Sequence, residues 1–293
     1  MRTILIICIL FLRLHTNAQT RNNYLEFKTY KKLQSYFRNH QKNTPLVSAH
    51  RGGPTTNFPE NCIPTFENTI KNHPAIIETD ISITKDSVLV MMHDDKLERT
   101  TNGTGKLSDY TYTELQKFFL KDNEGNLTNY KIPTLDEVLA WGKNKVIYTL
   151  DVKRNVPYKK VVEAVKKNNA EHFCIIITYN ANQAEEVTKM HPKVMISVSA
   201  RGQEDVERLL SKGIKKENII AFVGISIPPD DILQYFKSQN IPMVLGTMSN
   251  LDKSAIANGD NIYKEIFSKG IFVISSDRPE NVSNQIKILK NTK

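Results

Sequence analysis

The sequence is poor in several residue types whose abundance would define its class. Its 293 residues include three Cys, one Trp, 12 Gly and 12 Pro. Three Cys exclude a disulfide framework, and so little Gly and Pro excludes collagen-like and low-complexity chains. No Gly-x-Gly-x-x-Gly follows a predicted strand, which removes the main positive sign of a dinucleotide-binding fold. Beyond the N-terminus, no segment reaches the roughly 18 consecutive apolar residues of a membrane-spanning helix.

The N-terminus carries a short apolar run at residues 4–12, with an Arg on either side and a small-residue stretch ending at Ala18. The run is too short to span a bilayer but is typical of a secretory signal peptide. We therefore expect residues 1–18 to be a cleaved signal peptide. The mature chain, residues 19–293, would be periplasmic or secreted and would have no stable membrane anchor. A buried N-terminal strand or helix is the alternative.

The remaining cysteines and the charge give weaker signals. Cys62 and Cys174 are expected to be small buried residues. The formal net charge of +9 becomes +7 without residues 1–18, from 38 Lys+Arg and 31 Asp+Glu. Basic residues occur in short pairs such as Lys166–Lys167, not in runs interleaved with aromatics, so we expect no nucleic-acid partner.

Eight short apolar runs recur along the chain, and stretches of helical periodicity separate most of them. Strands that alternate with helices are typical of a parallel sheet. Eight such units within about 230 residues predict an α/β fold, a (β/α)8 TIM barrel. The predicted strands are residues 46–50, 76–81, 146–152, 174–178, 194–198, 219–223, 243–245 and 271–274. A short helix within residues 19–44 is expected to lead into the first strand.

One interval, residues 82–145, is too long for a single helix. Residues 88–92 favour the second strand of a hairpin, and helix starts at Thr111 and Thr134 have capping-box spacing. We predict that residues 84–130 form a small insertion after the second barrel strand, at the mouth of the barrel.

Polar residues end the first two predicted strands, the position where barrel enzymes build their sites. His50 and Arg51 offer a proton carrier and a bidentate anion binder. Glu78 and Asp80 are two residues apart, so they share one face of the strand. Two carboxylates within an apolar run repel each other unless a cation lies between them. An ordinary turn and a solvated edge strand are the alternatives.

The third predicted strand repeats this pattern with Asp151 and Lys153. Asp151 could complete a three-carboxylate site for Mg²⁺ or Ca²⁺, and Lys153 could hold a phosphate, although a surface ion pair is the alternative. His93 ends the predicted hairpin strand. A pair of His residues, one accepting a proton from a nucleophile and one donating to a leaving oxygen, suits phosphodiester cleavage.

These residues, in this order, resemble the glycerophosphodiester phosphodiesterase family. The resemblance extends from residue 50 to residue 153 and is thin beyond it, apart from residues 276–279. The matching segments are His50-Arg51-Gly52, Pro59-Glu60-Asn61, Glu78-Thr79-Asp80, His93-Asp94, Arg99-Thr100-Thr101-Asn102-Gly103-Thr104-Gly105, Pro133-Thr134-Leu135 and Asp151-Val152-Lys153.

The resemblance implies a TIM barrel that uses one divalent cation to cleave glycerophosphodiesters to glycerol 3-phosphate and an alcohol. It also implies that a neighbouring glycerol hydroxyl attacks phosphorus first, giving a cyclic phosphate that water opens. By position it assigns the general base to His50, the general acid to His93, phosphate binding to Arg51 and Lys153, the metal to Glu78, Asp80 and Asp151, and the orientation of His50 or Arg51 to Glu60.

The sequence departs from the family pattern at three places. Asp151 stands where the family usually has Glu, which shortens this ligand by one methylene. Cys62 stands where Thr usually follows Pro-Glu-Asn. The seventh predicted strand ends Leu245-Gly246-Thr247-Met248 where many members carry a Trp-Thr pair, so a substrate-contacting aromatic is missing and the family's head-group preference is not carried over.

Two other functions remain open at this point. A related phospholipase of the sphingomyelinase D or phosphoinositide type would need an exposed apolar rim, for which residues 118–120 are the only candidate. A non-catalytic binding protein for phosphate esters would be expected to lack a His or a metal carboxylate, and this chain has all of them.

Overall fold

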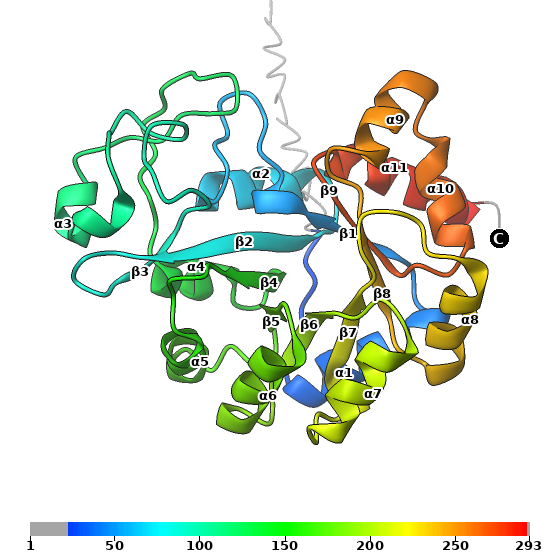
Figure 1. The fold of residues 1–293 in the computed structure, drawn as a ribbon. Helices are drawn as coiled ribbons and strands as arrows, with labels where there is room; N and C mark the ends of the chain where they lie inside the picture. Colours follow the sequence, from blue (N-terminus) through cyan, green and yellow to red (C-terminus); the bar gives the residue numbers. More distant parts are fainter. Residues whose placement is uncertain (1–22, 292–293) are drawn as a thin grey trace, which may run out of the picture.

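The main element of the fold is a closed barrel of eight parallel strands (Figure 1). The computed structural model describes residues 23–291, so the predicted signal peptide lies outside the described residues. The strands are β1 (Leu46–Ala49), β2 (Ile76–Ile83), β3 (Leu89–Met91), β4 (Ile147–Val152), β5 (Cys174–Thr178), β6 (Met195–Ser199), β7 (Ile219–Phe222), β8 (Met243–Gly246) and β9 (Val273–Ser276). Since β1 pairs with both β2 and β9, the barrel is closed, with β3 added antiparallel to β2. All eight predicted barrel strands are confirmed.

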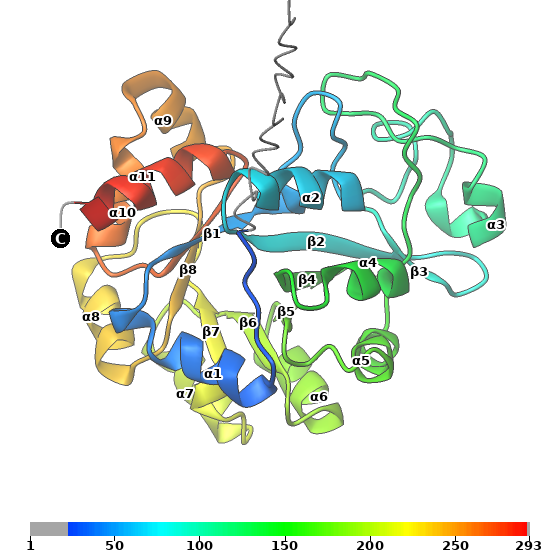
Figure 2. The same cartoon turned by 180° about the vertical axis from the view of Figure 1, so that it is seen from behind.

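Helices surround the barrel on all sides (Figures 1 and 2). They are α1 (Tyr30–Arg38), α2 (Ile63–Asn72), α3 (Tyr112–Leu115), α4 (Leu135–Gly142), α5 (Tyr158–Lys167), α6 (Ala181–Met190), α7 (Gln203–Ser211), α8 (Asp230–Gln239), α9 (Leu251–Asn258), α10 (Asn261–Ser268) and α11 (Pro279–Asn291), with short 3₁₀ turns η1 (His40–Lys42), η2 (His50–Gly52), η3 (Leu107–Asp109) and η4 (Lys216–Asn218). Among residues 23–291, none of these helices has the length and apolar character to cross a bilayer. Cys62 and Cys174 are both free and buried, as predicted.

Alternate residues of each strand face either the barrel interior or the surrounding helices. Outward-facing side chains such as Leu150 and Ile176 are fully buried against the helices. The first inward-facing residue of every strand is apolar: Leu46, Ile76, Ile147, Ile175, Met195, Ile220, Val244 and Val273. Leu33 and Phe37 of α1 pack against this layer. The predicted N-terminal helix is therefore α1, and it closes the amino-terminal end of the barrel.

The chain leaves the barrel between β2 and α4, where the insertion was predicted. This segment contains β3, η3 and α3, and it buries a small apolar core of its own. That core consists of Val90, Met92, Leu97, Leu107, Leu115, Leu120 and Ile132, together with Cys62 from the start of α2. Both predicted capping boxes are present, because Thr111 and Thr134 each exchange hydrogen bonds with the Glu three residues later. The insertion is thus a packed unit beside the mouth of the barrel.

Candidate active site

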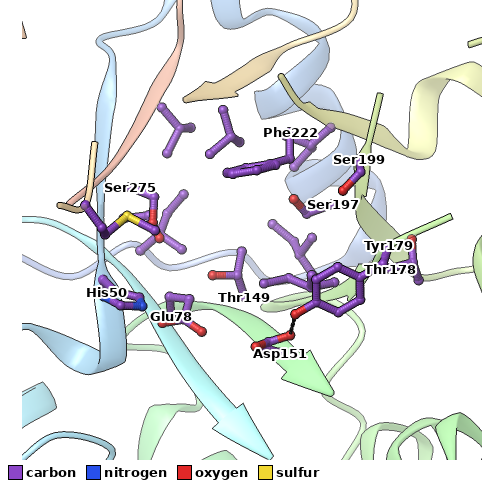
Figure 3. Close-up of a pocket in the computed structure, with 18 of the residues that line it drawn as sticks. His50, Glu78, Thr149, Asp151, Thr178, Tyr179, Ser197, Ser199, Phe222 and Ser275 are labelled. Atoms are coloured by element: carbon purple, nitrogen blue, oxygen red, sulfur yellow. Dashed lines mark hydrogen bonds between the residues drawn. The ribbon is translucent and has the colours of Figure 1, made fainter. Parts of the chain in front are cut away.

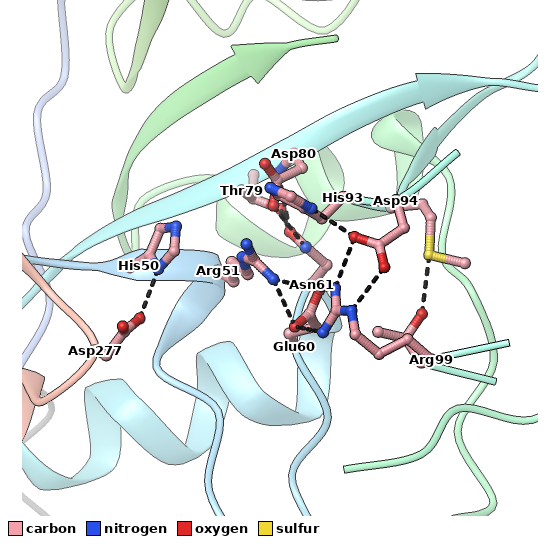
Figure 4. Close-up of polar contacts among 12 residues, drawn as sticks. His50, Arg51, Glu60, Asn61, Thr79, Asp80, His93, Asp94, Arg99 and Asp277 are labelled. Carbon is pink, nitrogen blue, oxygen red and sulfur yellow. Dashed lines mark hydrogen bonds and ion pairs between the residues drawn. The ribbon is translucent and has the colours of Figure 1, made fainter. Parts of the chain in front are cut away.

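The carboxyl ends of the strands bring the predicted site residues to the mouth of the barrel. His50, Glu78 and Asp151 face a pocket that runs along the barrel axis (Figure 3). In the view of Figure 4, Arg51 lies between His50 and His93, and Glu60 lies beneath Arg51. The site is therefore built from segments that lie far apart in the sequence but that the closed barrel gathers at one edge.

A strained turn directs Arg51 toward the site. Arg51, Gly52 and Gly53 all have positive φ, at 53°, 85° and 78°, and this region is unfavourable for a residue that carries a Cβ. The turn is fixed at both ends. The Arg51 amide donates to Oε2 of Glu78 at 2.7 Å, and the Thr69 hydroxyl donates to the Gly52 carbonyl at 2.6 Å.

We expect Gly52→Ala to destabilise the protein by about 2–5 kcal/mol. A left-handed conformation costs a non-glycine residue about 1–2 kcal/mol, and overpacking adds about 1–3 kcal/mol, since a Cβ at Gly52 would lie 2.3 Å from the Phe66 ring. Urea unfolding measures the loss. Gly213→Ala is the matched control, because Gly213 has a φ of +77° but no atom within 4 Å of its added Cβ. Equal losses in the two variants would contradict the steric explanation.

Three carboxylates form a buried cluster. Glu78, Asp80 and Asp151 each offer an oxygen within 4.8 Å of the other two. Burial, and after it the charges of Asp80 and Asp151, raise the pKa of Glu78 well above its ordinary value. Burial would also raise the pKa of Asp80, but the Lys153 ammonium 2.6 Å from its carboxylate outweighs this effect, and the pKa is lowered.

The donor set fits a divalent cation. Lys153 also lies 2.8 Å from Asp151, so one ammonium serves three carboxylates. With all three ionised, the cluster keeps a formal charge of −2, and the raised pKa of Glu78 reflects first its burial and then this uncompensated charge. Oxygen-only carboxylate sites are typical of Mg²⁺ and Ca²⁺. The cluster can therefore hold such an ion between its carboxylates.

Neighbouring polar side chains hold these carboxylates in place. The Asn61 amide donates to Oδ2 of Asp80 at 2.8 Å, while its own oxygen accepts from the Thr79 hydroxyl and the Asp80 amide. The Tyr179 hydroxyl donates to Oδ1 of Asp151. Burial and the nearby Asp151 charge raise the pKa of Tyr179, so the phenol keeps its proton and remains a donor.

Each of the two histidines is bound by a carboxylate through Nδ1. His50 Nδ1 lies 2.6 Å from Oδ1 of Asp277, and His93 Nδ1 lies 2.6 Å from Oδ1 of Asp94. An ionised carboxylate only accepts hydrogen bonds, so Nδ1 carries a proton and Nε2 is left for a reacting group. Hydrogen bonds from Arg99 lower the pKa of Asp94 far below its ordinary value. Burial would raise the pKa of Asp277, but the contact with His50 outweighs it and lowers the pKa.

A network of ion pairs connects His93 to Arg51. Arg99 binds both oxygens of Glu60 at 2.8 Å and both oxygens of Asp94 at 2.6 and 2.9 Å. Glu60 is buried and also accepts from Nη1 of Arg51 at 3.0 and 3.2 Å. Glu60 was predicted to orient His50 or Arg51, and the residue that it contacts is Arg51. Nε of Arg51 is buried and has no hydrogen-bond partner among residues 23–291.

Five contacting residues were not predicted as part of the site: Asn61, Asp94, Arg99, Tyr179 and Asp277. Tyr179 and Asp277 directly follow the ends of β5 and β9, so the rule that found His50 could have identified them. The other three lie in segments that carried the family resemblance, but their contacts with Asp80, His93 and Glu60 are visible only in the fold. At the end of β8, Thr247 is buried against the Ser275 carbonyl, and Met248 lines the pocket instead.

Comparison with known proteins agrees with this geometry. Residues 50–217 match the model of the glycerophosphoryl diester phosphodiesterase family. A glycerophosphodiester phosphodiesterase from Caldanaerobacter subterraneus is 34% identical over 160 residues. That match covers 52% of this chain and 65% of the relative, so the chain spans just under two thirds of the relative's length.

Solved structures extend the similarity over most of the chain. A glycerophosphoryl diester phosphodiesterase from Parabacteroides distasonis is 38% identical and superposes with a TM-score of 0.87, covering 91% of this chain and 94% of that one. A phosphodiesterase from Oleispira antarctica, solved in complex with the product sn-glycerol 3-phosphate, shares the fold at 18% identity and a TM-score of 0.65, covering 85% of this chain and 99% of that one. The chain belongs to the glycerophosphoryl diester phosphodiesterase family.

Proposed function

We propose that the chain hydrolyses glycerophosphodiesters to sn-glycerol 3-phosphate and an alcohol, with His50 and His93 as its acid-base pair. The observation that carries this proposal is the arrangement of the two imidazoles, each bound through Nδ1 by a carboxylate 2.6 Å away, beside a cluster of three buried carboxylates. Family membership supports the same reaction, and the Oleispira antarctica phosphodiesterase binds sn-glycerol 3-phosphate as product.

The two histidines take opposite roles in the proposed reaction. His50 accepts the proton of the attacking hydroxyl at Nε2, and Asp277 stabilises the imidazolium that forms. His93 donates a proton from Nε2 to the leaving oxygen, with Asp94 holding its ring. The Arg99 guanidinium holds Asp94 in its ionised form. Asp277 thus fixes the tautomer that leaves Nε2 of His50 free to accept a proton, and Asp94 stabilises the imidazolium form from which His93 donates.

Arg51 and Lys153 are proposed to bind the phosphate. Arg51 uses Nη1 to bind Glu60, which fixes the guanidinium, while Nη2, which makes no hydrogen bond among the described residues, remains a donor for a phosphate oxygen. Lys153 is a point charge between Asp80 and Asp151 at the same mouth.

Glu78, Asp80 and Asp151 are proposed to hold one divalent cation, Mg²⁺ or Ca²⁺. When bound, such an ion polarises a phosphoryl oxygen and offsets the negative charge that develops during displacement. The chain supplies the oriented ligands: Asn61 positions Asp80, Tyr179 positions Asp151, and the Arg51 amide positions Glu78. The shorter Asp151 is therefore supported by a tyrosine that the family pattern did not indicate.

Release of sn-glycerol 3-phosphate tests this proposal. The substrates are glycerophosphocholine, glycerophosphoethanolamine and glycerophosphoinositol, each assayed with and without chelator and with Mg²⁺ or Ca²⁺ added back. We expect turnover that chelator abolishes and one of the ions restores. Unchanged turnover in chelator would refute the cation requirement. Phosphodiester binding without any turnover would favour the non-catalytic binding protein.

The insertion gives no support to a membrane-docking phospholipase. Phe118 packs edge-on against Tyr110 at 5.5 Å, and Leu120 is buried in the core of the insertion. Phe119 lies under the Lys131 ammonium. Residues 118–120 therefore do not form an exposed apolar rim.

We also propose that the chain is exported. This proposal rests on the apolar run at residues 4–12 alone.

A further inference from the structure

The segment that follows β9 carries the carboxylate partner of His50. Asp277 directly follows β9, and its Oδ1 lies 2.6 Å from Nδ1 of His50 (Figure 4). The side chain of Asp277 is 52% exposed, whereas that of His50 is 19% exposed. Groups at an active site are held in place by packing or by hydrogen bonds from their neighbours. Because packing covers so little of Asp277, the position of its carboxylate depends on the backbone that carries it.

A buried carboxylate binds that backbone. Asp252 lies in the first turn of α9 and is 3% exposed. Its Oδ2 accepts a hydrogen bond from the backbone amide of Asp277 at 2.9 Å. The Ser276 hydroxyl donates to the same carboxylate, at 2.9 Å from Oδ1 and 3.0 Å from Oδ2. Asp252 thus holds two consecutive residues at the end of β9, and the second of them binds His50.

Asp252 is itself fixed from two directions. Its backbone amide donates to the Thr247 carbonyl at 2.8 Å, and the Thr247 amide donates to the Ser275 carbonyl at 2.8 Å. The Tyr263 hydroxyl donates to Oδ1 of Asp252 at 2.8 Å. Tyr263 is fully buried, and burial, followed by this hydrogen bond, raises the pKa of its phenol, so the phenol keeps its proton. The carboxylate of Asp252 is therefore tied to the ends of β8 and β9 and to α10.

The residue on the other side of Asp277 is held as well. The guanidinium of Arg278 lies 2.6 Å from Oδ1 of Asp260 and donates to the Tyr263 hydroxyl at 3.3 Å. The backbone amide of Arg278 donates to the Ser276 hydroxyl at 2.9 Å. Asp277 therefore lies between two anchored residues, and its own amide is bound by Asp252.

A carboxylate is an unfavourable choice for anchoring alone. Among the described residues, the hydrogen-bond donors to Asp252 are a phenol, a hydroxyl and a backbone amide, all of them neutral. Burying a negative charge without a cation is costly. In return, the carboxylate accepts a charge-assisted hydrogen bond from the Asp277 amide, and such bonds are roughly twice as strong as neutral ones. Accurate placement of Asp277 accounts for a charge at this position.

We propose that Asp252 is a positioning residue for the proposed general base. It holds the backbone at Asp277 so that Oδ1 of Asp277 stays on Nδ1 of His50, which leaves Nε2 of His50 for the attacking hydroxyl. Asp252 acts only through Asp277. Both residues lie beyond residues 50–217, the segment that matches the family model. This inference deepens the proposed function and rests on it.

The pH profile of Asp252→Ala tests the inference. A misplacement of about 1 Å can cost about 100-fold in rate, so we expect kcat to fall by about 10–100-fold. KM should stay unchanged, because Arg51 and Lys153 still bind the phosphate. Asp277 stabilises the imidazolium of His50, so a displaced Asp277 should move the acidic limb of kcat/KM to lower pH, by about half a unit. Asp252→Asn keeps the volume and removes the charge, so it should act in the same direction but less strongly.

A double-mutant cycle separates positioning from a merely structural role. In the Asp277→Ala background, Asp252→Ala should lower kcat by less than about twofold, since the contact through which Asp252 acts is already gone. Asp122→Ala is the matched control. Asp122 is also 3% exposed and accepts hydrogen bonds from several backbone amides, none of which belongs to a proposed site residue. It should lower stability to urea as Asp252→Ala does but leave the acidic limb in place.

Proton NMR of His50 gives a second result that needs no turnover. The Nδ1 proton signal, identified by its loss in Asp277→Ala, should shift upfield in both Asp252 variants and stay in place in Asp122→Ala. An unmoved signal or an unmoved acidic limb in the Asp252 variants would overturn the inference, as would an equal loss of kcat with and without Asp277. Asp252→Asn decides the matter if Asp252→Ala does not fold. Absence of turnover in the unmodified chain would refute the proposed function itself.

Discussion

Replacing His50 or His93 by Ala is expected to lower kcat for glycerophosphodiester hydrolysis by about 10²–10⁴-fold, the usual contribution of a positioned acid or base. Each histidine presents an Nε2 that its carboxylate partner leaves free, and each serves a different proton transfer. Residues that act as a unit are not additive, so the double variant should be little worse than the poorer single variant.

The pH dependence of kcat/KM checks this assignment. The unmodified enzyme should give a bell-shaped profile, with its acidic limb lost in His50→Ala and its alkaline limb lost in His93→Ala. His172→Ala is the control, because His172 precedes β5 at the opposite end of the barrel and contacts Phe173. Undiminished turnover in either site variant, or a loss of the same limb in both, would contradict the assigned roles.

Glu78→Gln is expected to raise the stability of the metal-free protein and to lower its catalytic activity. Glutamine removes one of three neighbouring negative charges that burial makes unfavourable, so the metal-free protein should gain about 1–2 kcal/mol of stability. The same change removes a metal ligand, so turnover should fall by at least 100-fold, a loss of about 3 kcal/mol in transition-state stabilisation. The raised pKa of Glu78 has the same physical origin as the expected gain in stability.

Thermal unfolding with and without Mg²⁺ or Ca²⁺ measures both effects. The ion should raise the melting temperature of the unmodified protein in a concentration-dependent way and leave that of Glu78→Gln unchanged. Glu163→Gln, at an exposed position of α5, is the charge-matched control and should respond to the ion like the unmodified protein. A Glu78→Gln variant that the ion still stabilises would exclude Glu78 as a ligand.

Much of the fold and of the site could be predicted because the signals are local. Each barrel strand begins with two or more apolar residues, as expected where both faces of a strand are buried. Glu78 and Asp80 were identifiable because two carboxylates inside such a run need a special reason. The strand ends at His50 and Asp151 could then be assigned to the same mouth, since parallel strands place their carboxyl ends at one edge.

The remaining features depend on contacts that no local pattern specifies. Asp277 meets His50 across 227 positions of sequence, and Arg99 meets Glu60 across 39. The depth of the pocket along the barrel axis was also beyond prediction. It depends on barrel closure, which brings lining residues from several strands to one level, and on Phe37 of α1, which closes the amino-terminal end of the barrel.

The two halves of the barrel contribute unequally to the site. Apart from Asp277, the residues proposed for chemistry lie between His50 and Lys153, within the segment that matches the family model. Strands β7, β8 and β9 mainly line the pocket along the barrel axis, through Phe222, Val244 and Ser275. New substrate preferences can therefore evolve by drift in the last three strands while the reaction stays intact. For the same reason, a directed-evolution library confined to these strands should yield altered specificity with few inactive clones.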